Sequence, residues 1–188
     1  MNDLKQFYSD LKVLVSVKPI RPFVCSGNPL DSDILIVGFN PATETSDFWS
    51  YFDDEYGFHK ERWLSDYKKY RKQNGKKTEV SHSRRVMEWI CNHLELETQQ
   101  FQVMETNIYS YPTARKSELS KNENKEVFDF ILKNINPKLI LTHGVDEKKY
   151  IETLNLDIPV ISEKHFAIGW SRDKARQVAN QIVALIDH

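Results

Sequence analysis

Residues 33–41, with the sequence Asp-Ile-Leu-Ile-Val-Gly-Phe-Asn-Pro, constrain the fold of this chain more than any other stretch. Four apolar residues (34–37), three of them β-branched, are bounded by polar residues, as is typical of a strand buried on both faces of a parallel sheet. Gly38 allows a close approach to a ligand or a backbone conformation closed to other residues. Pro41 fixes its own φ and biases Asn40 towards extended geometry. The pattern predicts a stiff turn that holds the Asn40 amide where open α/β sheets bind ligands. The alternative is an ordinary turn with Asn chosen for its turn propensity.

The rest of the chain alternates helical and strand patterns. Helical periodicity predicts helices over 4–14, 61–71, 83–94, 127–135, 146–154 and 175–186, and short apolar runs predict further strands over 102–107, 138–142 and 158–162. Such alternation predicts a three-layer α/β/α fold with a four-stranded parallel sheet and right-handed crossovers. A length of 188 residues suits a single domain over residues 1–188.

Four polar side chains follow the four expected strands: Asn40, Asn107, His143 and His165. Because parallel strands end at the same edge of a sheet, we expect these residues to converge there. This convergence is the main indication of a functional site.

Composition excludes several classes of protein. The chain has 40% apolar and 28% charged residues, no apolar run of membrane-spanning length, and no signal-peptide core at its N-terminus. Cys25 and Cys91 stand alone, so neither an iron–sulfur cluster nor a structural zinc site is expected. We expect a cytoplasmic protein with reduced thiols, no metal, no cofactor and no membrane partner, acting as a monomer.

The net charge of −1 conceals a basic block, since residues 60–85 carry +7 and the rest of the chain −8. Such a block can contact phosphates, and Lys68, Lys69, Arg71 and Lys72 are its candidate DNA contacts. The alternative is a solvated helix face with a charged loop.

Residues 38–41, Gly-Phe-Asn-Pro, resemble the first motif of the uracil-DNA glycosylase superfamily, closest to the Gly-x-Asn-Pro form of its mismatch-specific and single-strand-selective branches. Segments 105–115, 138–144 and 159–173 resemble later parts of that family in the expected order. The family's second motif usually has Pro and Ser directly after His, whereas Phe166 and Ala167 follow His165 here. The long aromatic stretch between residues 41 and 81 also departs from the pattern.

The resemblance implies a uracil-DNA glycosylase-like fold and roles for particular residues. Asn40 would position a water molecule at the anomeric carbon, and His165 would donate a hydrogen bond to the departing base. Asn107 would read a pyrimidine edge. The remaining candidates for base binding are Gly38, Phe39, Phe48 and Trp49, and those for DNA contact are Arg115, Ile168, Trp170, Ser171 and Arg172. Ile168 and Trp170 would be the apolar wedge.

Structural roles are the alternatives for several of these residues. His165 could bond a nearby carbonyl, Asn107 could cap a turn, and Phe48 and Trp49 could pack in the core.

The expected function is a metal-free DNA glycosylase that removes uracil or another damaged pyrimidine from single- or double-stranded DNA. Two alternatives remain open: a non-catalytic nucleic-acid-binding module of the same fold, and a small-nucleotide hydrolase or binding protein.

Overall fold

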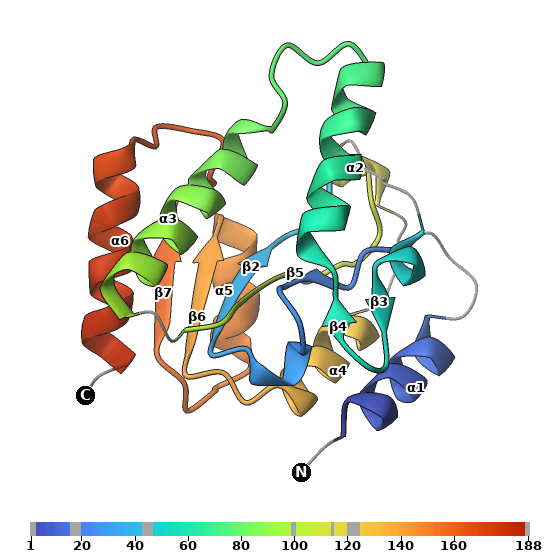
Figure 1. Cartoon of the computed structure of the whole chain (residues 1–188). Coiled ribbons are helices and arrows are strands. Elements are labelled where there is room, and N and C mark those ends of the chain that lie inside the picture. Colours follow the sequence, from blue (N-terminus) through green and yellow to red (C-terminus); the bar gives the residue numbers. More distant parts are fainter. Residues whose placement is uncertain are drawn as a thin grey trace.

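A mixed five-stranded sheet forms the centre of the computed structural model, which describes residues 3–15, 20–42, 47–98, 101–113, 115–119 and 125–186 (Figure 1). The strand order is β1-β5-β2-β6-β7, and the strands are β1 (Phe23–Val24), β5 (Val103–Asn107), β2 (Ile34–Gly38), β6 (Leu139–His143) and β7 (Val160–Glu163). Strand β2 lies in the middle, parallel to both of its neighbours. Every residue of β2 is buried, as its continuous apolar run predicts.

The sheet differs from the predicted four-stranded parallel one by its edge strand β1, which pairs antiparallel with β5. The prediction missed β1 because it is only two residues long and directly follows Pro22 in a proline-rich segment. The general α/β class and the other four strands are confirmed.

The six predicted helices are confirmed, with ends that differ by a few residues. They are α1 (Leu4–Leu14), α2 (Lys60–Gln73), α3 (His82–Thr98), α4 (Glu126–Asn134), α5 (Val145–Thr153) and α6 (Arg172–Ile186). Short 3₁₀ turns lie at η1 (Pro29–Asp31), η2 (Phe48–Ser50) and η3 (Lys116–Glu118).

Two hydrophobic cores cover the two faces of the sheet. Helices α3 and α6 lie side by side on one face (Figure 1). On that face Ile36 and Leu141 of the sheet and Ile90 of α3 belong to one buried cluster. The opposite face, which includes Leu35 and Val37, packs against α1, α4 and a cluster of aromatic rings. Alternation along β2 explains the division, because successive side chains point to opposite faces.

The segment between β2 and β5 builds a wall above one end of the sheet. It contains η2, the small antiparallel pair β3 (Phe52–Asp53) and β4 (Gly57–Phe58), and then α2. In Figure 1, α2 extends beyond the carboxyl ends of the strands, and the loop after it descends to the first turn of α3. The N-terminus of α3 therefore lies at the same edge of the sheet as the Asn40 turn.

No helix in the described ranges has the length and apolar character needed to cross a bilayer.

Replacing Val37 with Ala should destabilise the protein by about 2–3 kcal/mol, because two buried methyl groups are lost from the central strand. Val13→Ala makes the same chemical change at a position 79% exposed and should alter stability by less than about 0.5 kcal/mol. Urea denaturation of both variants measures the difference. Equal losses would contradict the assignment of β2 as the buried centre of the sheet.

Candidate functional site

Three neighbouring strands end in a row of residues on the face of the sheet covered by α3 and α6. Gly38 of β2 is in register with Asn107 of β5. The preceding pair of β2 and β6 is Val37 with Thr142, so Gly38 lies beside His143. Asn107 and His143 thus stand on either side of a residue that has no side chain.

The absence of a side chain at Gly38 makes this arrangement possible. A Cβ atom there would lie 2.7 Å from Asn107 Oδ1 and 3.0 Å from His143 Nε2. Both distances are shorter than ordinary contacts, so any larger residue would displace the amide, the imidazole or both. Gly38 is therefore required for the side chains to converge.

The amide of Asn40 is held in a defined orientation. Its Nδ2 donates to Thr113 Oγ1 at 2.7 Å, to the Thr113 carbonyl at 3.2 Å and to the Pro41 carbonyl at 3.2 Å. Because the amino group faces these three acceptors, the carbonyl Oδ1 is directed away from them. Within the part of the chain that the structure describes, no donor is bonded to this oxygen, which can accept a hydrogen bond from a ligand or water.

His143 is buried, and its ring stacks on Phe166 with centroids 4.1 Å apart. Burial, helped by the neighbouring His165, lowers its pKa to about 3. The ring is therefore neutral near pH 7. Its Nδ1 is buried without a hydrogen-bond partner among the described residues.

His165 follows β7 and lies edge-on to His143, with ring centroids 5.3 Å apart. The backbone N–H of Ala167 donates to its Nδ1 at 3.2 Å, so the proton of the neutral ring lies on Nε2. Partial burial lowers the pKa of His165, which favours this neutral form. His165 is exposed and presents an N–H donor at the edge of the site.

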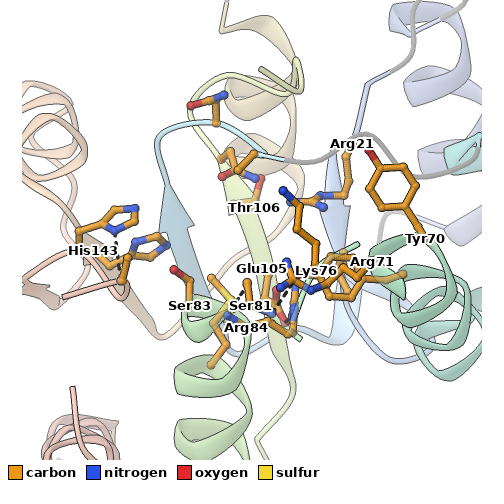
Figure 2. Close-up of a pocket in the computed structure, with 18 residues that line it drawn as sticks. Arg21, Tyr70, Arg71, Lys76, Ser81, Ser83, Arg84, Glu105, Thr106 and His143 are labelled. Atoms are coloured by element: carbon orange, nitrogen blue, oxygen red, sulfur yellow. Dashed lines mark hydrogen bonds and ion pairs between the residues drawn. The ribbon is translucent and has the colours of Figure 1, made fainter. Parts of the chain in front are cut away.

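These residues line one side of a cavity of about 590 Å³, a volume within the range of small-molecule sites. Its lining residues are Arg21, Val24, Asn40, Ala42, Tyr67, Tyr70, Arg71, Lys76, Ser81, Ser83, Arg84, Met87, Glu105, Thr106, Asn107, His143, His165 and Ala167. Figure 2 shows His143 on one side, Arg21 and Tyr70 on the other, and Arg84 with Glu105 between them. We refer to the side with His143 and His165 as the histidine end, and to the remainder with Arg21, Arg84 and Glu105 as the arginine end.

The arginine end contains a buried ion pair. Arg84, on the first turn of α3, donates to the Glu105 carboxylate of β5, and both side chains are only 8% exposed. Glu105 reaches the cavity because it lies two residues before Asn107 on the same face of β5. Arg84 also lies over the ring of Trp63, with 4.8 Å between its guanidinium carbon and the ring centre.

The turn after β2 is supported from α5. Gly144 has a φ of 146°, and a Cβ atom there would lie 2.2 Å from Glu147 Oε2. The buried Glu147 carboxylate also accepts a hydrogen bond from the Phe39 backbone. Burial raises the pKa of Glu147 despite that bond.

The structure brings together Asn40, Asn107 and His165 from the predicted site residues, with Gly38 between the strands and Arg71 on the cavity wall. Phe48 and Trp49 lie elsewhere. Phe48 is buried against Phe23 and Phe58, and the Trp49 ring packs edge-on against Tyr8. Neither ring lines the cavity, because η2 folds back into the aromatic core on the other face of the sheet.

The loop after His165 separates the two proposed wedge residues. Ile168 is 68% exposed, whereas Trp170 is buried, and the Trp170 indole donates to the Lys164 carbonyl at 3.2 Å. Trp170 thus packs beneath the loop, against Phe166. Ser171 caps α6 through the Lys174 N–H, and Arg172 lies over the Trp89 ring.

The other predicted contacts lie outside the cavity. The Phe39 ring packs on Tyr109, with Lys116 over it, and Arg115 is exposed at the start of η3. Lys68, Lys69 and Lys72 line a second groove, of about 500 Å³, which we call the lysine groove. Its full lining is Ser65, Lys68, Lys69, Lys72, Lys76, Lys77, Thr78 and Glu79. Lys76 lines both the groove and the cavity, so the two adjoin.

Sequence reasoning missed Arg21, Arg84, Glu105 and Thr113 as parts of the site. One signal was present for Glu105, because a charged residue in a short strand expected to be buried requires a partner. Thr113 lies in the loop that follows Asn107, at the expected edge of the sheet, but the sequence does not indicate that it bonds Asn40. Arg21 lies in a proline-rich segment, and nothing in the sequence indicates that this segment reaches the cavity.

Within the described ranges, no group of three or more His, Cys, Asp or Glu side chains is arranged to hold a metal ion. The sequence matches no protein-family model, and no curated protein is similar enough to it to count as a relative. The chemistry of the site therefore rests on its geometry.

The neutral, buried His143 should make stability depend on pH. Its native pKa of about 3 lies below the ordinary value of 6.5, so the unfolded chain takes up a proton first as the pH falls. Between pH 7 and 5 this residue should lower the free energy of unfolding by about 2 kcal/mol. Urea denaturation at both pH values should show this loss in the wild type and in His165→Gln, and a loss about 2 kcal/mol smaller in His143→Gln.

An identical pH dependence in His143→Gln and the wild type would contradict the neutral burial of His143. NMR titration gives a direct check, because the His143 ring signals should stay constant between pH 8 and 5.

Proposed function

We propose that this protein hydrolyses the N-glycosidic bond of uracil or another modified pyrimidine, with DNA as the substrate. The observation that carries the proposal is the fixed Asn40 amide, whose Oδ1 accepts no hydrogen bond from the described residues and which lines the same cavity as Asn107 and the two histidines. The site supplies groups to orient a water molecule, read a base and receive its developing charge. These are the tasks of a glycosylase acting on an extruded nucleotide.

In this mechanism Asn40 Oδ1 accepts a hydrogen bond from the attacking water and directs it toward the anomeric carbon. An amide is too weakly basic to deprotonate water in the ground state, so bond breaking must lead. Positive charge then develops on the sugar as the base leaves with the bonding electrons. The water oxygen forms the new bond to the anomeric carbon, and the proton that the water loses passes through solvent to the departing base anion. The Thr113 acceptors keep Oδ1 pointed inward throughout.

The base would occupy the cavity in front of Asn107, His143 and His165. The Asn107 amide can accept from a pyrimidine N–H and donate to its carbonyl oxygen. His165, protonated on Nε2, can donate to the oxygen where negative charge collects. A neutral donor placed there in advance stabilises this charge more in the transition state than in the bound substrate.

The lysine groove supports a polynucleotide substrate. Five lysines from α2 and the loop after it line this groove, which shares Lys76 with the cavity. A strand whose nucleotide enters the cavity would pass its neighbouring phosphates along such a surface. The basic block thus has a position suited to phosphate contacts.

A free nucleotide is the second candidate substrate, because four of the cavity's own lining residues are cationic: Arg21, Arg71, Lys76 and Arg84. The same chemistry at Asn40 would then act on a nucleoside phosphate. Uracil release from deoxyuridine monophosphate and from a uracil-containing oligonucleotide, measured in parallel, separates the two candidates.

Asn40→Ala should reduce uracil release from an oligonucleotide by at least about 100-fold, because the water loses its orienting acceptor. Asn180→Ala, on the exposed side of α6, is the matched control and should retain wild-type release. The measurement is alkaline cleavage of abasic sites under single-turnover conditions. Circular dichroism establishes that both variants are folded, and wild-type release by folded Asn40→Ala would remove Asn40 from the mechanism.

Neutralising the lysine groove should weaken the salt dependence of DNA binding. Replacing Lys68, Lys69, Lys72 and Lys77 with Gln should flatten the slope of log K against log salt by up to roughly 3 units on single strands, about 0.7 for each lost phosphate contact. Arg71 is left in place because its Nε donates to the Thr78 carbonyl and supports the loop.

Gln at four exposed lysines outside both cavities provides the control: Lys12, Lys133, Lys148 and Lys149. This variant carries the same change in net charge and should keep the wild-type slope. Equal slopes for the two quadruple variants would assign the lysine groove to ordinary solvated surface.

A further inference from the structure

The arginine end of the cavity has more cationic side chains than carboxylates among its described lining residues. Its cationic lining side chains are Arg21, Arg71, Lys76 and Arg84, and Glu105 is the single carboxylate among the described lining residues. Glu105 is already paired with Arg84. Because His143 is neutral, the cavity wall carries about three uncompensated positive charges.

Arg21 is the guanidinium beside the Arg84–Glu105 pair, and its side chain is half-buried. Its guanidinium carbon lies 5.6 Å from the centre of the Trp63 ring, which Arg84 also contacts. Among the described residues its side chain has neither an ion pair nor a hydrogen bond. Burial and the adjacent Arg84 charge lower the pKa of Arg21 to about 10.

Two guanidinium groups beside one carboxylate are poorly explained as structural support. Withdrawing an unpaired cation from water is costly, and an apolar residue at position 21 would pack against Trp63 without that cost. A guanidinium that keeps its donors free in a cavity is instead suited to a planar, bidentate anion such as phosphate.

The first turn of α3 adds to the same positive field. Ser81 caps this helix by accepting from the Arg84 N–H at 3.1 Å, and Ser81 and Ser83 both line the cavity. The partial positive charge of the helix N-terminus therefore faces the space between Arg84 and the histidine end. The helix and the arginine pair favour the same kind of ligand.

The spacing along β5 connects this anion site with the base site. Glu105, which holds Arg84, and Asn107 lie on the same face of the strand, two residues or about 7 Å apart. One nucleotide could reach both positions. We propose that Arg21 and Arg84 form a subsite for a phosphate group attached to the nucleoside whose base occupies the Asn107 end. The position of the base rests on the proposed function, whereas the anion site does not.

The test compares ligands that differ only in the phosphate. Isothermal titration with the wild type uses 2′-fluoro-2′-deoxyuridine and its 5′-monophosphate, since the fluorine disfavours cleavage of the glycosidic bond. A second pair is a trinucleotide with this nucleoside at its centre and either a phosphate or an uncharged methylphosphonate on the 5′ side. We expect at least tenfold tighter binding of the ligand that carries the 5′ phosphate in one or both pairs.

Arg21→Gln should reduce that preference to threefold or less without changing the affinity for the nucleoside or for the methylphosphonate trinucleotide. Arg176→Gln, on the exposed face of α6, is the matched control and should keep the full preference. A preference in the monophosphate pair identifies a free nucleotide as the source of the phosphate, and one in the trinucleotide pair identifies a strand.

Equal binding within both pairs in the wild type would overturn the proposal, as would a preference that survives in folded Arg21→Gln. The base-release assay is independent of these comparisons. A phosphate preference without base release would refute the proposed hydrolysis and keep the subsite, and release without a preference would do the opposite.

Discussion

The close approach of Asn107 and His143 across Gly38 is the constraint on which the site depends. The strand register places these residues side by side, but only a residue without a Cβ atom leaves room for both polar atoms. Both polar side chains then line the cavity at the strand ends. Asn40 follows two residues later and also lines the cavity, and its amino group is held by Thr113, so that its carbonyl oxygen is turned away from Thr113.

Electrostatics divides the cavity into two chemically different ends. At the histidine end, burial keeps His143 neutral, so that end offers hydrogen bonds without charge. At the arginine end, Glu105 compensates Arg84 and leaves Arg21 unpaired among the described residues. An uncharged base and a charged phosphate differ in the same way, and this likeness is the basis for proposing a nucleotide as the ligand.

The segment between β2 and β5 determines how the cavity is enclosed. Its aromatic residues pack into the core, with Phe48 against Phe23 and Phe58, and this packing anchors the base of α2. Helix α2 then carries Tyr67, Tyr70 and Arg71 to the cavity wall and the lysines to the adjoining groove. The aromatic residues thus support the site from a distance.

The sequence by itself determined the helices, the four parallel strands and the edge of the sheet where polar residues gather. Short apolar runs and helical periodicity are local properties, and the carboxyl ends of parallel strands must share an edge. Asn40, Asn107 and His165 could be predicted on this basis. Strand β1 could not, because two residues after a proline carry too little pattern to reveal pairing with β5.

Only the tertiary structure decided which side chains share the cavity. The sequence alone cannot distinguish Trp49 and Trp170 from tryptophans that contact a nucleic acid. In the structure Trp49 packs against Tyr8, and Trp170 packs against Phe166. Arg21 and Arg84 are separated by more than sixty residues and meet beside Trp63. Contacts of this kind depend on the paths of loops and on helix packing. They join residues that are distant in the chain, and they leave no periodic pattern in the sequence.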